Sequence, residues 1–299
     1  MGNAMGLFLQ QLIGGVASGS MFAILALGIV LIYRSTGTLN FAQGQMAMFS
    51  TFIAWSAMST GMGFWPAVLL TLLSALAMGA LVEWLIVRRV EGTSDLNSLI
   101  VAMGLFLIFD GLALYVWGPL PKSFGPFSFF SGGASCVGGV CIGRLNLGIL
   151  VVSIVTTALL YLLFQCTRFG LALRATALNR PASRLVGIPV GRMLSTGWGL
   201  GTAVGAIAGI LAAQSLGLEI RTMFFVVLFA LAAAVLGGLD SPVGAVVGGL
   251  IIGVVKNLAG TYTPSSVGSI DLAVAFAVIV LVLMVRPNGI FGRPVRMRV

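Results

Sequence analysis

The sequence has 299 residues, of which 59% are hydrophobic and 8% are charged, and its net charge is +9. Soluble domains carry about 25% charged residues, so this chain has too few charges to keep a soluble surface hydrated. The composition excludes a soluble enzyme, a disordered tail and a nucleic-acid-binding domain, and it requires a lipid environment. Because the apolar runs are too long for barrel strands, we expect an all-α fold, a polytopic transmembrane helical bundle.

The apolar runs predict eight or nine crossings of the membrane. In chain order they are residues 8–32, 44–60, 64–87, 97–117, 147–166, 193–215, 223–238, 243–258 and 271–285. The run 223–238 is short and fits either a crossing or a re-entrant segment. We expect residues 1–299 to form a single transmembrane domain with some broken or re-entrant helices.

Nine crossings divide the basic residues unevenly between the two sides. Twelve of the 16 lie on one side: Arg34, Arg88, Arg89, Arg168, Arg174, Arg180, Arg184, Arg192, Arg286, Arg293, Arg296 and Arg298. The other side and the nearby span ends hold Lys122, Arg144, Arg221 and Lys256. Because cytoplasmic loops carry the excess of Lys and Arg, we expect the C-terminus in the cytoplasm and the N-terminus outside.

Two glycine-rich polar segments interrupt the apolar pattern, at residues 37–45 and 237–244. Non-helical backbone at membrane depth is tolerated only inside protein or beside a water-filled cavity. Broken helices in transporters often mark the solute path or a mechanical joint. The alternative is a pair of ordinary loops with helix caps, for which Asn40 and Asp240 are suitable residues.

The largest outer loop, residues 118–146, carries Cys136 and Cys141. An extracytoplasmic location permits a disulfide between them, and two free thiols are the alternative. The chain has no histidine, which excludes imidazole metal sites and histidine-dependent catalysis. We therefore expect no metal and no cofactor.

The basic loop 168–192 is expected to face the cytoplasm. Asn179 is suited to cap a short helix that begins near Pro181 and ends at Gly187. Leu185 and the following valine give this helix an apolar edge, which would suit either a groove in a cytoplasmic protein or the lipid headgroups. In the fourth run, Asp110 is a functional candidate because burying a charge is costly; a position near the interface is the alternative.

Four stretches of the sequence resemble the branched-chain amino acid ABC transporter permeases, the LivH/LivM family, and are closer to LivH. They are residues 21–44, which contain Leu39-Asn40-Phe41-Ala42-Gln43-Gly44, then 174–188, 237–245 and 285–293. The resemblance implies a transport subunit rather than an enzyme. Such a subunit translocates branched-chain amino acids or related small polar solutes, such as urea, amides and organic acids, by alternating access.

The resemblance also implies partners. These are a second permease chain, the same or different, two cytoplasmic ABC ATPases that hydrolyse ATP, and a periplasmic substrate-binding protein, all at a bacterial inner membrane. The chain lacks a Gly-x-x-x-x-Gly-Lys phosphate-binding loop, which agrees with ATP binding by other subunits. An ion-coupled secondary transporter that works without ATPases is the alternative function.

On this basis we assign three sets of residues. The substrate pathway or its inner gate comprises Asn40, Phe41, Gln43, Gln45 and Asp110. ATPase coupling is assigned to Arg174, Asn179, Arg184, Leu185 and Gly187. The hinge-like turn comprises Gly237, Gly238, Pro242 and Gly244. Gln43 and Gln45 stand where the family often has a histidine and an acidic residue, so hydrogen bonding replaces charge there.

Overall fold

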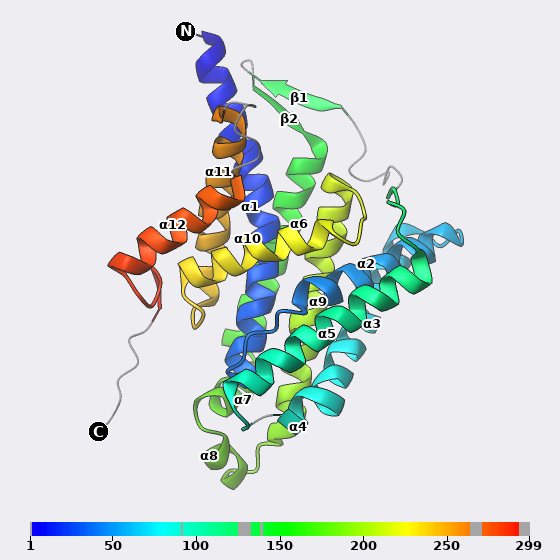
Figure 1. Ribbon diagram of the computed structural model, residues 1–299, viewed down its shortest axis with the longest axis vertical. Coiled ribbons are helices and arrows are strands. Elements are labelled where there is room, and N and C mark those ends of the chain that lie inside the picture. Colours follow the sequence, from blue (N-terminus) through cyan, green and yellow to red (C-terminus); the bar gives the residue numbers. More distant parts are fainter. Residues whose placement is uncertain (1, 91, 125–132, 138–139, 264–270, 293–299) are drawn as a thin grey trace. The chain divides into compact units, whose positions relative to one another are not determined.

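A computed structural model of the chain describes residues 2–90, 92–124, 133–137, 140–263 and 271–292 (Figure 1). Its helices are α1 (Gly2–Thr36), α2 (Gln43–Ser59), α3 (Phe64–Val82), α4 (Arg88–Val90), α5 (Asp95–Trp117), α6 (Arg144–Cys166), α7 (Arg168–Leu178), α8 (Arg180–Leu185), α9 (Val190–Leu216), α10 (Thr222–Gly237), α11 (Pro242–Tyr262) and α12 (Asp271–Val285). A π-helical turn, Glu83–Val87, joins α3 to α4. A helix lies at each of the nine predicted runs, which confirms the helical bundle.

Six helical stretches have the length and apolar composition to cross a membrane. They are Met5–Thr36, Phe64–Val90, Leu96–Trp117, Arg144–Cys166, Val190–Leu216 and Pro242–Tyr262. The remaining three predicted runs form shorter helices, α2 of 17 residues, α10 of 16 and α12 of 15. At about 1.5 Å per residue, these three helices are about 23–26 Å long, less than the hydrocarbon thickness of about 30 Å.

The chain forms two compact units, and each unit is built from segments that are distant in sequence. One unit comprises Met1–Leu27, Pro126–Ile154 and Val227–Val299, and the other comprises Gly28–Gly125 and Val155–Val226. The helices α1, α6 and α10 each contribute residues to both units. The second unit contains the first polar segment and the basic loop, and it is the unit in which the site is described below.

The helix surfaces are arranged for lipid rather than for water. On α3, the buried residues are mostly small and recur at every fourth position: Ala67, Thr71, Ala75 and Gly79. The opposite side of α3 exposes leucines, among them Leu69 and Leu73. Lipid tails are as apolar as leucine, so helices in a bilayer associate through close packing of small residues, and the large apolar side chains are left outside.

Glycines allow α9 to approach its neighbours closely. α9 packs along both α2 and α3 (Figure 1). A methyl group at Gly199 would lie 2.7 Å from the carbonyl oxygen of Leu76, and one at Gly79 would lie 2.7 Å from the carbonyl oxygen of Trp198. These distances are shorter than van der Waals contact, so the α3–α9 interface depends on the absence of side chains at both positions.

The predicted outer loop contains a hairpin that was not expected from the sequence. Within residues 118–146, strand β1 (Ala134–Val137) pairs antiparallel with β2 (Val140–Gly143). The register places Cys136 opposite Cys141 in the backbone ladder. The hairpin holds the only two strands in the part of the chain that the structure describes.

The α3–α9 packing predicts that Gly199→Ala destabilises the fold by about 1–3 kcal/mol, because the added methyl group forces apart two backbones. The measurement is the thermal unfolding midpoint of the purified protein in mild detergent. Gly104→Ala on α5 is the matched control, since nothing lies within 4 Å of a methyl group there, and it should leave the midpoint unchanged or raise it slightly. Equal midpoints for the two variants would contradict this packing.

Candidate functional site

The first polar segment forms a tight, buried break between α1 and α2. α1 ends at Thr36, and Gly37 follows with a φ of 78°, a conformation that glycine adopts readily. The Asn40 side chain is 1% exposed, and its Oδ1 accepts a hydrogen bond of 3.0 Å from the Ala42 N–H. Ala42, not Asn40, directly precedes α2 and makes no side-chain cap. Asn40 therefore stabilises the turn rather than capping the helix.

Gln43 ties the start of α2 to the middle of α9. Its Nε2 donates a hydrogen bond of 2.8 Å to the carbonyl oxygen of Gly201. Gly201 lies about 16 Å along α9 from Val190, at about 1.5 Å per residue. A methyl group at Gly205 would lie 2.6 Å from the same Nε2, so this glycine makes room for the amide. The break thus lies part-way along a membrane-length helix and is covered by protein, as a broken helix at that depth requires.

Two residues further along α2, Gln45 contacts Asp110, the only acidic residue of α5 beyond its first turn. Its Nε2 donates a hydrogen bond of 2.8 Å to Oδ1 of Asp110. Its Oε1 is buried and has no hydrogen-bond partner among the described residues. Burying an unpaired polar atom is costly, so this oxygen is available to accept a hydrogen bond from a solute or from water. Phe41 is half-buried beside the break.

Two side chains of α9 also bury polar atoms that have no hydrogen-bond partner among the described residues. Neither residue was expected from the sequence to belong to the site. The Trp198 Nε1 and both amide atoms of Gln214 are buried without a hydrogen-bond partner in the described part of the chain. Both residues lie in an apolar, glycine-rich helix, where a single tryptophan or glutamine gives no periodic signal. The structure therefore adds them as candidate polar contacts of a solute.

A cavity lies beside the break. Its volume is about 240 Å³, and the residues from Thr36 to Asn40 form one wall. Trp198 of α9, Leu105 of α5 and Arg180 of α8 line other parts of the cavity. Backbone that leaves the helical pattern at membrane depth is tolerated where it lines such a space. The predicted pathway residue Asn40 and Arg180, the first residue of α8, therefore line the same cavity.

The predicted short helix in the basic loop is confirmed as α8. The Asn179 Oδ1 accepts a hydrogen bond of 3.0 Å from the Ala182 N–H, which caps the helix start. Gly187 follows the helix end with a φ of 79°, the left-handed conformation common after helix ends. Asparagine before the helix and glycine after it therefore set its length, as the sequence predicted.

α8 presents an apolar edge and is anchored from behind. Leu185 and Val186 are 89% and 75% exposed, and Leu178 at the end of α7 is 87% exposed. On the anchored side, an Arg180 guanidinium nitrogen donates a hydrogen bond of 3.0 Å to the carbonyl oxygen of Ser35 in the last turn of α1. The short helix is thus linked directly to the helix that leads into the break.

Arg174, assigned to coupling, is engaged within the chain. Its Nη1 donates a hydrogen bond of 2.8 Å to Oε1 of Gln165, which holds α7 against the end of α6. This contact gives Arg174 a structural role within the chain. The Arg184 guanidinium has no hydrogen bond or ion pair with any described residue, and with Gly187 it lines an open pocket of about 700 Å³.

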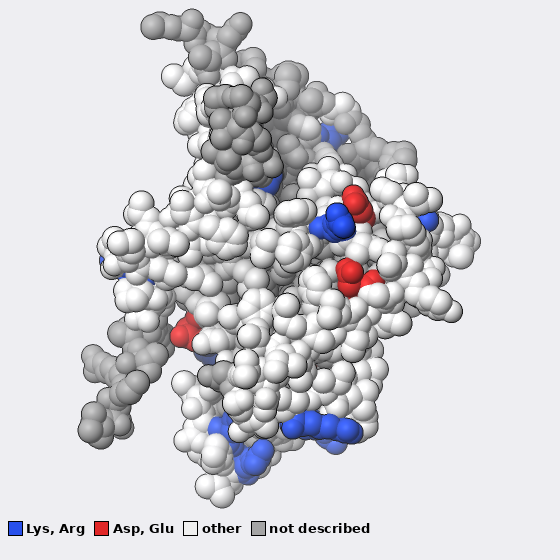
Figure 2. All heavy atoms as spheres, in the orientation of Figure 1, with Lys and Arg blue, Asp and Glu red and all other residues white. Residues whose placement is uncertain are grey.

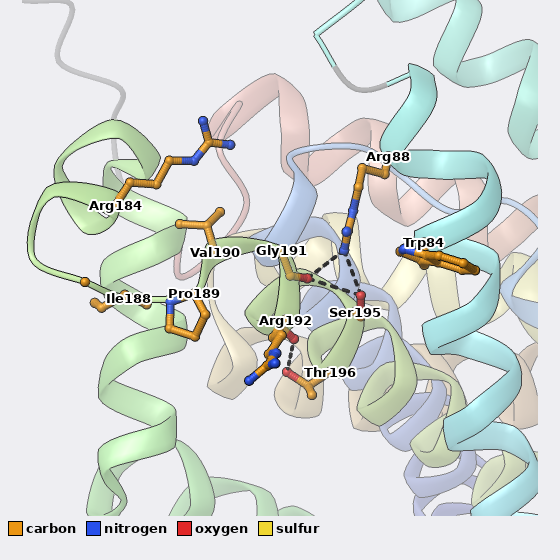
Figure 3. Close-up of a pocket in the computed structure, with 11 residues that line it drawn as sticks. Trp84, Arg88, Arg184, Ile188, Pro189, Val190, Gly191, Arg192, Ser195 and Thr196 are labelled. Atoms are coloured by element: carbon orange, nitrogen blue, oxygen red, sulfur yellow. Dashed lines mark hydrogen bonds between the residues drawn. The ribbon is translucent and has the colours of Figure 1, made fainter.

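A polar cluster beside this pocket fastens the π-helical turn and α4 to the start of α9, and Figure 3 shows its residues Arg88, Gly191 and Ser195. Glu83 is 1% exposed, and its carboxylate pairs with Arg88 at 2.9 Å and accepts a hydrogen bond from the Ser195 hydroxyl. The Arg88 guanidinium also donates to the Gly191 carbonyl at 2.7 Å and to Ser195 Oγ at 2.9 Å. No local sequence pattern indicates this cluster, because its two halves are more than a hundred residues apart.

The second polar segment forms the turn between α10 and α11, in the other unit. Ser241 caps α11, its Oγ accepting a hydrogen bond of 3.0 Å from the Gly244 N–H, and Pro242 occupies the first turn. The suggestion that Asp240 caps this helix is wrong, because Asp240 is exposed and one residue too early. Gly238 has a φ of 101°, a conformation that glycine adopts readily. This backbone conformation explains why a glycine stands at one of the positions assigned to the turn.

The same turn is held by the segment after α12. The backbone N–H groups of Ile290 and Phe291 donate to the carbonyl oxygens of Leu236 and Gly237 at 2.9 and 3.0 Å. A methyl group at Gly238 would lie 2.7 Å from the Gly292 nitrogen. Two of the stretches that carry the family resemblance, 237–245 and 285–293, therefore pack against each other.

Comparison with known proteins identifies the family. Residues 11–285 match the family described as "Branched-chain amino acid transport system / permease component". The chain is 30% identical to the high-affinity branched-chain amino acid transport system permease protein LivH of Salmonella typhimurium and to BraD of Pseudomonas aeruginosa, with 96% of each chain covered. It is 27% identical to a probable LivH of Methanocaldococcus jannaschii, with 93% of this chain and 91% of that protein covered.

The matched region includes the break, the basic loop and the turn between α10 and α11. These are the segments in which the structure departs from simple membrane-crossing helices. The relatives match over nearly their whole length as well as over nearly all of this chain. The chain therefore belongs to the family of branched-chain amino acid transport permease components, the membrane subunits of ATP-binding-cassette importers.

Proposed function

We propose that this chain moves branched-chain amino acids, or small polar solutes of similar size, along α2 and α9 beside the α1–α2 break. The observation that carries the proposal is the buried Gln45 Oε1, which has no partner among the described residues. It is an acceptor suited to the ammonium group of an amino acid, and the unpaired Trp198 N–H is a donor suited to a carboxylate. Uncharged groups bind a zwitterion without a net charge to be buried.

The partners follow from the same arrangement. Two cytoplasmic ABC ATPases bind the exposed edge formed by Leu185 and Val186, because an apolar side chain on a short helix is stabilised in a protein groove. A second permease chain completes the pathway, and a periplasmic substrate-binding protein delivers the solute. The permease makes and breaks no bonds, since ATP is hydrolysed in the partner chains.

Arg180 gives the coupling a route. When an ATPase moves α8, the hydrogen bond from Arg180 to the Ser35 carbonyl transmits the displacement to the end of α1. The end of α1 leads into residues 37–40, which line the 240 Å³ cavity. A change in this cavity opens or closes the inner end of the path, and the turn at Gly237, Gly238, Pro242 and Gly244 is proposed to act as the corresponding joint in the other unit.

The proposed location is a bacterial inner membrane with the C-terminus in the cytoplasm. In Figure 2, the basic side chains over α8 and α4 have no acidic side chains among them. Arg34, Arg88 and Arg180 come from three different parts of the chain that end in this region. The positive-inside rule assigns such an end to the cytoplasm.

Gln45→Leu should lower solute uptake by about tenfold, which corresponds to about 1.4 kcal/mol, because the path loses an acceptor and Asp110 loses its amide donor. The measurement is uptake of radiolabelled leucine by cells or vesicles that contain the complete importer. Ser50→Ala is the matched control: Ser50 is also buried in α2, and among the described residues its hydroxyl bonds only to the Met46 carbonyl of the same helix. Unimpaired uptake by Gln45→Leu would show that this amide serves packing alone.

Leu185→Ser should weaken ATPase co-purification by about tenfold, because a groove loses the burial of one leucine side chain, worth about 1.5–3 kcal/mol. Its 89% exposure means that the fold does not depend on it. Leu120→Ser is the control, since Leu120 is 71% exposed and follows the C-terminal end of α5, outside α8. Equal recovery of ATPase with both variants would rule out α8 as the docking helix.

We also propose that Cys136 and Cys141 form a disulfide across the hairpin, because the backbone register places them opposite each other on the side assigned to the oxidising compartment. The intact mass of the purified chain should increase by two hydrogens on reduction. Alkylation without reductant should modify one cysteine, the exposed Cys166. Alkylation of all three cysteines under these conditions would exclude the bond.

A further inference from the structure

The open pocket of about 700 Å³ has no part in the proposed solute path. Three arginines line it, Arg88, Arg184 and Arg192, and its lining includes no aspartate or glutamate. Figure 3 shows these arginines coming from separate segments, with Trp84 at one side of the pocket. Like charges brought together around an open space favour an anion in that space.

The three guanidinium groups are not equivalent. The carboxylate of Glu83, which is buried behind the pocket, pairs with Arg88, and Arg88 also donates to the Gly191 carbonyl and to Ser195. The guanidinium groups of Arg184 and Arg192 have no hydrogen bond or ion pair with any described residue. Glu83 thus offsets and positions one arginine, and two positive charges remain available to a ligand.

Backbone groups add to this preference. α9 begins at the pocket with Val190, and its N-cap Pro189 makes no side-chain hydrogen bond to the first turn. The first N–H groups of a helix have no partner within the helix, and they favour anions together with the helix dipole. Gly191 and Arg192, in the first turn of this 27-residue helix, both line the pocket.

The position of the pocket indicates where the anion comes from. It lies at the ends of two stretches long enough to cross a membrane, Phe64–Val90 and Val190–Leu216. Beside it, the side chains of Leu81, Trp84 and Leu85 are 52%, 56% and 43% exposed. Tryptophan is enriched at the membrane–water interface, and exposed leucines at the end of a spanning helix suit acyl chains.

We propose that this pocket binds the headgroup of an anionic phospholipid of the cytoplasmic leaflet. Arg184 and Arg192 bind the phosphate with the first turn of α9, and the acyl chains lie along Trp84 and the neighbouring leucines of α3. Basic pockets between helices at the cytoplasmic side recognise such headgroups. The site is independent of the solute that is transported, and it places a lipid beside α8, where it stabilises the position of the coupling helix.

The test is a titration followed by native mass spectrometry of the detergent-purified protein with the partner subunits that it retains. The probes are short-chain phosphatidylglycerol, phosphatidylcholine with the same chains, and inorganic phosphate. We expect phosphatidylglycerol to bind at least tenfold more tightly than the other two. Arg192→Gln should weaken this binding about tenfold, as expected for loss of one charge-assisted contact to phosphate.

Arg168→Gln is the matched control, because Arg168 is an exposed arginine of the same loop that does not line the pocket. It should bind phosphatidylglycerol as the unmodified chain does. Equal binding of both phospholipids, equal weakening by the two variants, or binding of inorganic phosphate as tight as that of phosphatidylglycerol would each overturn the proposal. Loss of ATPase from Arg192→Gln with unchanged lipid binding would also overturn it and would assign the pocket to a protein partner.

Discussion

Inside a hydrocarbon layer, an interrupted helix leaves N–H and C=O groups that only protein or enclosed water can satisfy. The segment between α1 and α2 is such an interruption, and the surrounding structure meets its requirements one by one. Asn40 closes the turn, Gln43 reaches α9, and the glycines of α9 give the amide the space it needs. The close α2–α9 and α3–α9 packing is therefore required by the break as well as by helix association in lipid.

The same constraint explains why polar groups are valuable here. Most side chains that meet the bilayer are apolar, so each buried amide or indole N–H without an internal partner is a position where a polar solute is better accommodated than lipid. Arg180 of α8 and Asn40 of the proposed pathway both line the cavity beside the break. In the proposed mechanism, the hydrogen bond from Arg180 to the Ser35 carbonyl links movement of α8 to access to the path.

The arginines that give the chain its net charge of +9 are not interchangeable markers of topology. Arg180 binds a backbone carbonyl, Arg174 binds a neighbouring amide, and Arg88 is paired with a buried carboxylate. Arg184 and Arg192 remain without such contacts and face an open pocket. These arginines therefore have three different roles: anchoring a helix, fastening α4 to α9 and, as we propose, binding an anion.

Local signals predicted most of the fold and a smaller part of the site. Apolar runs located nine helices, and Asn179 and Gly187 bounded α8, because span length and helix capping depend on neighbouring residues. Contacts between distant segments, such as Gln43 with Gly201 or Glu83 with Ser195, leave no local pattern and were not predictable. The cap of α11 was misassigned by one residue, since Asp240 and Ser241 are both good capping residues and only the backbone geometry distinguishes them.

We propose that partner ATPases drive the motion of a permease built around this break. The most direct test is uptake of radiolabelled leucine into proteoliposomes that contain the chain with its co-purified permease, ATPases and binding protein. Our account predicts uptake that requires ATP and is unchanged by a protonophore. Uptake by this chain alone without ATP, abolished by the protonophore, would contradict it and would establish an ion-coupled transporter.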